Sequence, residues 1–153
     1  MTIRAVVRGV GHYLPERVVE NVEFEKTLET TDEWIRARTG IERRHMAAEG
    51  ETTSMLAIAA AKAALHDAGM TADEIDTIVV ATSTPDLTFP SVGTMVQAGL
   101  EMRHGFAYDI QAVCAGFVYA LTNAKVTVRR AMLGGFVLEI VGANKAPRVR
   151  RVE

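Results

Sequence analysis

An uninterrupted run of four apolar residues, from Ile78 to Ala81, says most about the fold of this chain. It follows a capping pattern at residues 71–74 and precedes a loop that contains Pro85 and Pro90. Consecutive β-branched and apolar residues, without alternation, are typical of a strand that is buried on both faces. Such strands lie in parallel sheets that carry helices on both sides. The run therefore predicts a layered α/β fold.

Strand and helix patterns alternate along the rest of the sequence. Further strands are expected at residues 4–10, 106–110 and 136–141. Helices are expected at residues 21–28, 30–40, 53–68 and 91–100, and from Cys114 to about residue 130. Asn21 and Thr30 are the expected caps of the first two helices, and Gly69 is the expected end of the third. Without a repeat or a linker, the prediction is a single domain over residues 1–153 with a mostly parallel sheet.

Composition and charge indicate which classes of protein this chain can belong to. The chain is 48% hydrophobic and 24% charged, which is typical of a globular domain. The longest apolar window is interrupted by Lys62 and is too short to span a bilayer, and the first residues lack the features of a secretory signal. We therefore expect a cytoplasmic protein. A basic tail begins at Lys125; it is either a solvated end or a surface for an acidic partner, and no motif that reads nucleic acid accompanies it.

The single cysteine, Cys114, is the candidate catalytic residue. It excludes an internal disulfide framework and a multi-cysteine zinc site, so no metal site is expected. It lies where a predicted strand turns into an apolar helix, and the amide groups at a helix start stabilise a thiolate. Ala112, Ala115 and Gly116 leave room for an acyl chain. By local context alone, a lone cysteine beside Val and Phe is more often a small core residue.

Two distant segments carry a resemblance to a known family. The first is Tyr108-Asp-Ile-Gln-Ala-Val-Cys114-Ala-Gly-Phe117, and the second is Thr30-Thr-Asp-Glu-Trp34-Ile followed by Arg38-Thr-Gly-Ile41 and by Arg43 or Arg44. Both resemble segments of β-ketoacyl-acyl carrier protein synthase III. The resemblance implies that Cys114 accepts an acyl primer as a thioester. It also implies that Trp34 and Arg38 sandwich the adenine of coenzyme A, with Thr30 contacting the nucleotide.

The resemblance also implies the architecture and the reaction. It predicts one half of a thiolase-like αβαβα fold, in a homodimer or with a partner half-domain. The reaction would condense acyl-CoA with malonyl-acyl carrier protein, without a cofactor. Phe89 resembles the aromatic residue that reaches into the neighbour's acyl pocket, although it could equally cover its own core. The helix from Cys114 would then bury an apolar side consisting of Phe117, Val118, Leu121 and Val128 against a second half.

The family's pattern is incomplete in this sequence. The catalytic His and Asn of the family belong to its carboxy-terminal half, and this chain is expected to end before that half. Neither Asn144 nor any of the four histidines, His12, His45, His66 and His104, matches those positions. The tail departs from the pattern from about residue 124. The sequence therefore predicts an incomplete or inactive synthase, and the alternative is a non-catalytic half-domain that binds coenzyme A or dimerises.

Overall fold

The computed structural model describes residues 6–130 and 135–140 of the chain. The described part divides into two compact units, of which the larger contains residues 6–13 and 52–140 and the smaller contains residues 14–51. The single domain over residues 1–153 stays a prediction. Much of the tail that we expected to diverge, including Asn144, lies outside the described residues.

The larger unit is built on a three-stranded parallel sheet with the strand order β4-β3-β5. The strands are β3 (Ile75–Ala81), β4 (Phe106–Ile110) and β5 (Gly135–Ile140). Val79 of β3 pairs with Tyr108 of β4 on one side and with Leu138 of β5 on the other. The predicted strand at 136–141 is therefore present and begins one residue earlier, while Val141 lies outside the described residues.

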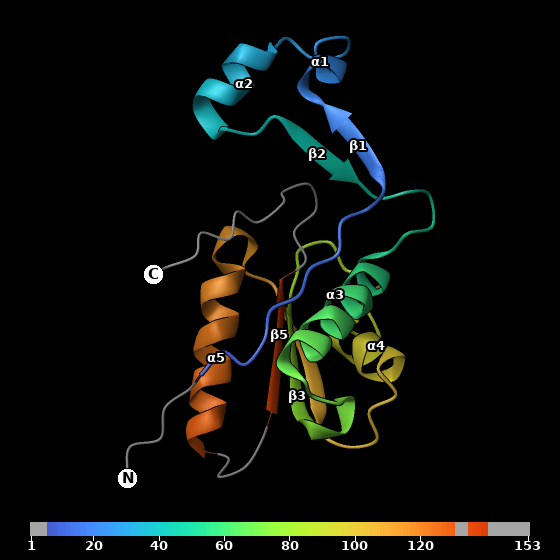
Figure 1. Cartoon of the computed structure of the whole chain (residues 1–153), viewed down its shortest axis with the longest axis vertical. Coiled ribbons are helices and arrows are strands. Elements are labelled where there is room, and N and C mark those ends of the chain that lie inside the picture. The colour runs from blue at the N-terminus through green and yellow to red at the C-terminus, as the bar shows by residue number, and fades with distance from the viewer. Residues whose placement is uncertain (1–5, 131–134, 141–153) are drawn as a thin grey trace. The chain divides into compact units, whose positions relative to one another are not determined.

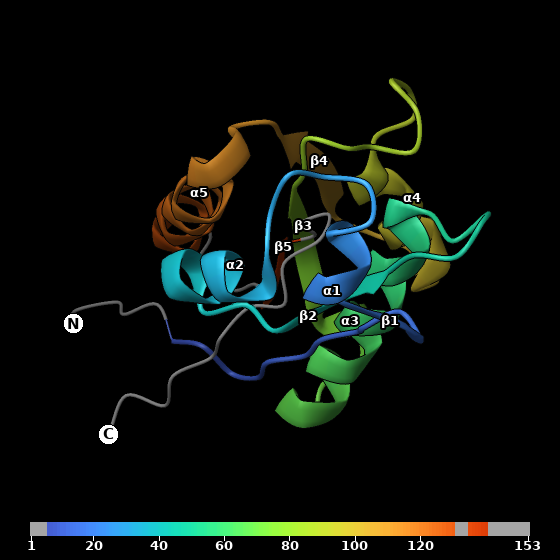
Figure 2. The ribbon, with the colours of Figure 1, turned by 90° about the horizontal axis from the view of Figure 1, so that it is seen from above.

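Helices cover both faces of this sheet (Figure 1, Figure 2). Helices α3 (Thr53–Ala68) and α4 (Val92–Gly99) pack on one face, and α5 (Gly116–Arg130) packs on the other. Ile78, Val79 and Val80 in the central strand are fully buried because each face of the sheet has its own helical layer. The layered α/β fold with a parallel sheet is thus confirmed.

Local signals set the ends of α3 where the sequence predicted them, and α4 is one residue shorter at each end than predicted. The side chain of Thr52 accepts a hydrogen bond from Met55 N–H at the start of α3. Gly69 ends the helix in the left-handed conformation, at φ 63°, and its N–H bonds to the carbonyl of His66 at 3.1 Å. The expected capping box between Thr71 and Glu74 is also present, in a single 3₁₀ turn before β3.

The strand predicted at residues 4–10 is wrong for the part that the structure describes. Residues 6–10 form no strand. Instead the Val10 N–H donates to the Asp67 carboxylate at 2.8 Å, and the backbone of Gly9 and Gly11 lies directly against α3. A Cβ atom at Gly11 would come within 2.2 Å of the Ala64 nitrogen, so only glycine permits this approach. Packing against an alanine-rich helix replaces strand pairing in this segment.

The smaller unit consists of a two-stranded antiparallel sheet and two short helices. Strand β1 (Arg17–Glu20) pairs with β2 (Arg43–Met46), and the helices are α1 (Asn21–Phe24) and α2 (Asp32–Thr39). The cap of α2 is Thr31 rather than Thr30, and Gly40 ends the helix at φ 65° as predicted. Asn21 is not a cap: it is the first residue of α1, which ends at Phe24 rather than at residue 28.

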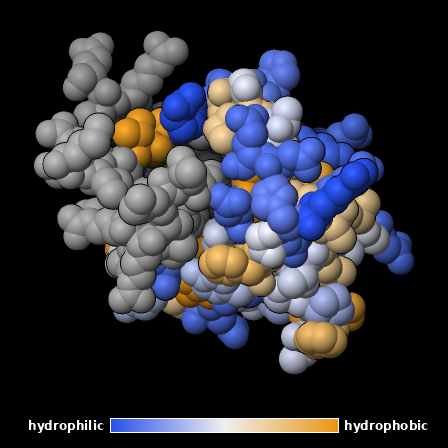
Figure 3. All heavy atoms as spheres, turned by 90° about the horizontal axis from the view of Figure 1, so that it is seen from below, coloured by the Kyte–Doolittle hydropathy of each residue, from blue (hydrophilic) through white to orange (hydrophobic). Residues whose placement is uncertain are grey.

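The exposed part of α5 carries several large apolar residues. Its buried hydrophobic residues among those described are Ala120 and Ala124, whereas Phe117, Val118 and Leu121 are 47%, 59% and 44% exposed. The apolar side that the sequence predicted for a partner is therefore uncovered within the described chain; the side chain of Val128 is outside it. Elsewhere, hydrophobic residues are dispersed among hydrophilic ones on the described face in Figure 3. Within the described residues no helix combines the length and apolar character needed to cross a membrane.

Candidate functional site

Cys114 lies in a short turn between the sheet and its covering helix. The turn is the 3₁₀ helix η2 (Val113–Ala115), so α5 begins at Gly116 and not at Cys114 as expected. Cys114 is exposed in the described chain, so it is not part of the core of the larger unit. The turn follows the carboxyl end of β4, next to the carboxyl end of β3. This is the edge of a parallel sheet at which ligands bind in open α/β folds.

The backbone around Cys114 is tightly constrained. Gly116 packs so closely on the end of β3 that an added Cβ would lie 3.2 Å from the Cβ of Ala81. Val113 has a φ of 45°, in the left-handed region that β-branched residues rarely adopt. Such a conformation costs about 1–3 kcal/mol and persists only where the surroundings enforce it. The turn therefore presents the cysteine from a strained but well-packed backbone.

Asp109 joins β4 to the start of α4. Its two carboxylate oxygens accept hydrogen bonds from Val92 N–H at 2.8 Å and Gly93 N–H at 2.7 Å. Both of these residues are buried, and a helix start has free amide groups that an anion satisfies well. The strand that leads to Cys114 is thus fastened to a helix on the opposite face of the sheet from α5.

A second carboxylate, Asp86, fastens the loop after β3 to α3. Its oxygens accept hydrogen bonds from Ser54 N–H at 2.9 Å and from the Ser54 hydroxyl at 2.5 Å. Thr53 supports the same junction, because its hydroxyl donates to the carbonyl of Thr84 at 2.6 Å. Burial raises the pKa of Asp86, but hydrogen bonds from Ser54 and Thr52 outweigh it and leave the pKa below its ordinary value.

The lowered pKa of Asp86 predicts a pH-dependent contribution to stability. A carboxyl group whose pKa is lower in the folded chain stabilises the fold above its unfolded pKa, and this contribution disappears as the pH falls through the folded value. We expect Asp86→Asn to flatten the decrease in the free energy of unfolding between about pH 5 and 3, as measured by urea denaturation. Asp73→Asn, on the surface, is the control; an equal flattening in both variants would contradict the prediction.

Phe89 lies in the loop between Asp86 and the start of α4, and it is 87% exposed. It therefore does not cover the core of its own unit. Leu87, in the same loop, is 53% exposed. The loop thus presents apolar side chains to its surroundings, while its ends are held by hydrogen bonds. A role of Phe89 in the acyl pocket of a neighbouring chain stays a prediction.

Trp34 and Thr30 line a pocket in the smaller unit. The pocket has a volume of about 520 Å³, and its lining is formed by Phe24, Leu28, Glu29, Thr30, Trp34, Ile35, Arg44 and Met46. Among the described residues, the hydroxyl oxygen of Thr30 is buried and forms no hydrogen bond. Buried polar atoms are almost always paired, so an orphaned hydroxyl at this pocket suits a bound polar ligand. The pocket thus brings together two of the three residues predicted to bind coenzyme A.

Arg38, the third of these residues, contacts Trp34 but does not line the pocket. Its guanidinium carbon lies 4.3 Å from the centroid of the indole ring. This is a cation–π contact, and the two groups are too close for an adenine to lie between them. The predicted sandwich would require Arg38 to move off the ring. In the conformation described here, a base can stack only on the other face of Trp34.

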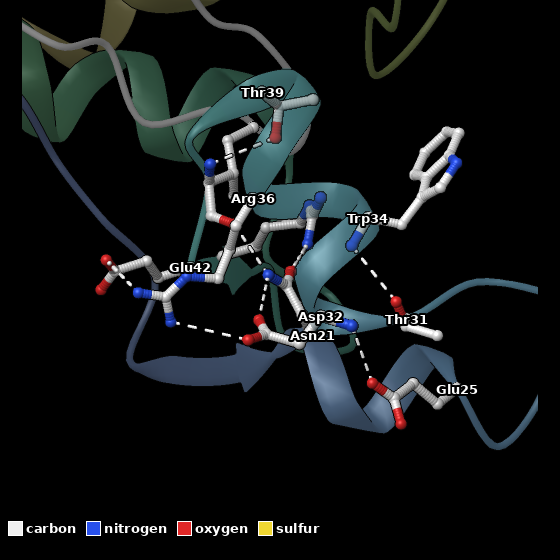
Figure 4. Close-up of polar contacts among 10 residues, drawn as sticks. Asn21, Glu25, Thr31, Asp32, Trp34, Arg36, Thr39 and Glu42 are labelled. Atoms are coloured by element: carbon white, nitrogen blue, oxygen red, sulfur yellow. Dashed lines mark hydrogen bonds and ion pairs between the residues drawn. The ribbon is translucent and has the colours of Figure 1, made fainter.

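A buried hydrogen-bond network supports this pocket, and sequence reasoning missed it (Figure 4). Asn21 is fully buried; its amide nitrogen donates to Asp32 Oδ1 at 2.8 Å and to the carbonyl of Ile41 at 2.7 Å. The oxygen of Asn21 accepts a hydrogen bond from Arg44 Nη1 at 2.7 Å. Arg36 bridges Asp32 and Glu42 on the surface side of the network. No local pattern in the sequence distinguishes such an asparagine from a helix cap.

Two of the four histidines form polar contacts, each within its own unit. His45 Nδ1 lies 2.6 Å from the carbonyl of Pro15, and His104 Nε2 lies 3.3 Å from Asp76 Oδ1. His66 is in the last turn of α3. Within the described residues there is no group of three or more His, Cys, Asp or Glu side chains that could hold a metal ion.

Curated relatives settle the family. The chain is 67% identical over 146 residues to the β-ketoacyl-[acyl-carrier-protein] synthase III of Paracoccus denitrificans, and 78% identical over 124 residues to that of Rhodobacter capsulatus. These alignments cover 95% and 81% of the chain. The chain belongs to the β-ketoacyl-acyl carrier protein synthase III family. It spans 45% and 38% of the length of these two synthases, less than half of either.

Solved structures of synthase III agree with this assignment. The crystal structure of 3-oxoacyl-[acyl-carrier-protein] synthase III from Aquifex aeolicus matches with a TM-score of 0.80 and 42% identity. The match covers 85% of this chain and 42% of that one. No protein-family model matches the chain. The fold is therefore part of the thiolase-like fold of synthase III, as the sequence predicted.

Proposed function

We propose that this chain carries the acyl-accepting cysteine and the nucleotide site of a β-ketoacyl-acyl carrier protein synthase III. The observation that supports this most is the exposed Cys114 on a constrained turn at the carboxyl edge of a parallel sheet, in a chain of this family. Its thiolate attacks the carbonyl carbon of an acyl-CoA, and the bond from that carbon to the CoA sulfur breaks. The CoA thiolate takes up a proton, and the acyl group remains as a thioester on Cys114.

The pocket at Trp34 is the proposed site for the nucleotide of coenzyme A. Its aromatic and aliphatic lining suits an adenine ring, and the free hydroxyl of Thr30 is available for a polar atom of the ligand. Arg38 completes the site once it moves off the indole ring. The transfer changes no oxidation state, so the proposal needs no cofactor.

Condensation is the proposed second reaction of the whole synthase. Malonyl-acyl carrier protein would lose carbon dioxide, and the resulting carbanion would attack the thioester on Cys114 and release the thiolate. This step needs hydrogen-bond donors for the developing enolate oxygen. In a polypeptide of these 153 residues we expect no condensation, because none of its histidines matches the family's catalytic position. The proposed setting is a cytoplasmic enzyme that acts as a homodimer or with a partner half-domain.

Acylation of Cys114 tests the proposal. The 153-residue chain is incubated with acetyl-CoA, and its intact mass is followed over time. We expect slow addition of one acetyl group to the parent chain and none to Cys114→Ala. Acetylation of Cys114→Ala at the same rate would refute the role of the cysteine, because the modification would then be nonspecific. Cys114→Ser is a second control that keeps a nucleophilic oxygen of similar size.

The alternative is a non-catalytic half-domain that binds coenzyme A or dimerises. The exposed apolar side of α5 favours it, because a face of this kind commonly marks a contact with another protein. The acylation experiment, combined with a measurement of coenzyme A binding, distinguishes the two functions. Binding of coenzyme A that depends on Trp34, without any acylation of Cys114, would favour the alternative.

A further inference from the structure

Arg44 is a cation in the Trp34 pocket to which neither the sequence nor the family assignment gave a role. Of the described residues that line the pocket, it alone carries a positive charge. Arg44 is half-buried, whereas Glu29, the acidic lining residue, is exposed at the rim. A half-buried guanidinium keeps most of its charge available to a ligand, because water screens it less than it screens an exposed group.

The guanidinium of Arg44 is held on two sides. Its Nη1 donates to Asn21 Oδ1 at 2.7 Å, and its central carbon lies 4.9 Å from the centroid of the Phe24 ring. Asn21 cannot rotate away, because its amide nitrogen is engaged by Asp32 and Ile41 and its side chain is fully buried. The position of Arg44 is therefore set before any ligand arrives.

The remaining N–H groups of Arg44 are the natural partners of an anion. A guanidinium has five N–H donors, and the bond to Asn21 uses one of them. None of the ion pairs in the described part of the chain includes Arg44. Planar guanidinium groups bind phosphate through two parallel hydrogen bonds. A preorganised arginine beside an exposed indole therefore suits a ligand that combines an aromatic base with phosphate.

We propose that Arg44 recognises a phosphate group of the coenzyme A nucleotide and that Asn21 is its positioning residue. This inference rests on the proposed nucleotide site and adds the group that distinguishes a phosphorylated ligand from a plain nucleoside. Arg38 does not take this role in the present conformation, because it lies on the Trp34 ring and outside the pocket lining. Coenzyme A offers a 3′-phosphate and a diphosphate, which share the chemistry that Arg44 recognises.

Calorimetric titration of the full chain tests Arg44 with coenzyme A, dephospho-coenzyme A and adenosine. We expect Arg44→Gln to weaken coenzyme A binding about tenfold or more and to leave adenosine binding within about twofold. The control is Arg43→Gln, which makes the same charge change at the next residue of β2 but lines a different pocket. Equal weakening in both variants would overturn the proposal, because the effect would then be general electrostatics.

The dephospho-coenzyme A measurement separates the two phosphate sources. If Arg44→Gln weakens coenzyme A binding but not dephospho-coenzyme A binding, Arg44 contacts the 3′-phosphate; if it weakens both, Arg44 contacts the diphosphate. Arg44→Lys keeps the charge but not the planar pair of donors, and we expect it to retain less than half of the parent's preference for coenzyme A over adenosine. Full retention in Arg44→Lys would overturn the bidentate contact.

A double-variant cycle tests Asn21. If Asn21 acts by holding Arg44, Asn21→Ala weakens coenzyme A binding, and the double variant Asn21→Ala/Arg44→Gln binds no more weakly than Arg44→Gln alone. Additive losses would overturn the positioning role. Should Asn21→Ala fail to fold, the Arg44 variants still decide the phosphate contact. Two results separate this inference from the nucleotide site. If coenzyme A binding depends on Trp34 but Arg44→Gln binds coenzyme A as well as the parent does, only the inference about Arg44 is refuted. If the parent chain binds no coenzyme A, the nucleotide site is refuted as well.

Discussion

Trp34→Ala should weaken the binding of coenzyme A by about 5- to 100-fold, because stacking of a base on an aromatic side chain contributes about 1–3 kcal/mol. The indole is 52% exposed, and the face that Arg38 does not cover is free to stack on a base. Isothermal titration of the 153-residue chain with coenzyme A measures the loss.

Two controls separate binding from folding in this experiment. Trp34→Phe keeps an aromatic face, and we expect it to lose only part of the affinity. The thermal unfolding of Trp34→Ala should stay close to that of the parent, because little of the side chain packs in the interior. An unchanged affinity in Trp34→Ala would remove the nucleotide site from the proposed enzyme and from the alternative half-domain alike.

Asp109→Ala should lower the free energy of unfolding by about 3–6 kcal/mol. The carboxylate accepts the N–H groups of Val92 and Gly93, and each hydrogen bond to a charged group contributes about 1.5–3 kcal/mol. Alanine would leave both buried donors unsatisfied at the start of α4. Urea denaturation followed by circular dichroism measures the change.

Asp67→Ala is the matched control for this prediction. The Asp67 carboxylate accepts a single exposed backbone N–H, that of Val10, so we expect its loss to cost about 1 kcal/mol or less. Asp109→Asn should fall between the two, because an amide oxygen can still accept one of the hydrogen bonds. If Asp109→Ala were no more destabilising than Asp67→Ala, the carboxylate would not be what joins β4 to α4.

These two residues also differ in how readily the sequence reveals them. Trp34 stands in a recognisable signature beside Arg38, and its helix has a local cap and a local end. Asp109 precedes the cysteine segment without any pattern that assigns it to α4, whose bonded residues lie 16 and 17 positions earlier in the chain. The proposed binding residue Trp34 could therefore be predicted, whereas Asp109, which joins β4 to α4, could not.

Features that depend on neighbouring residues could be predicted from the amino-acid sequence. The apolar run from Ile78 to Ala81 predicted a central strand because a strand buried on both faces needs apolar residues at every position. The end of α3 followed from Gly69, since caps act within one turn of a helix. The cysteine at a strand-to-helix turn and the Trp34 signature likewise depend on neighbouring residues, and together they identified the family.

Contacts between distant residues were decided only in the folded chain. Asn21 has the side chain of a helix cap, but its hydrogen-bond partners lie 11 to 23 residues away in the sequence. It is therefore the centre of a buried hydrogen-bond network and not a cap. Residues 6–10 have the composition of a strand, yet Gly9 and Gly11 let their segment pack on α3. Periodicity, caps and turns depend only on residues that are close in the sequence. Burial, close backbone approach and polar networks depend on which distant segments pack together, and tertiary packing decides that.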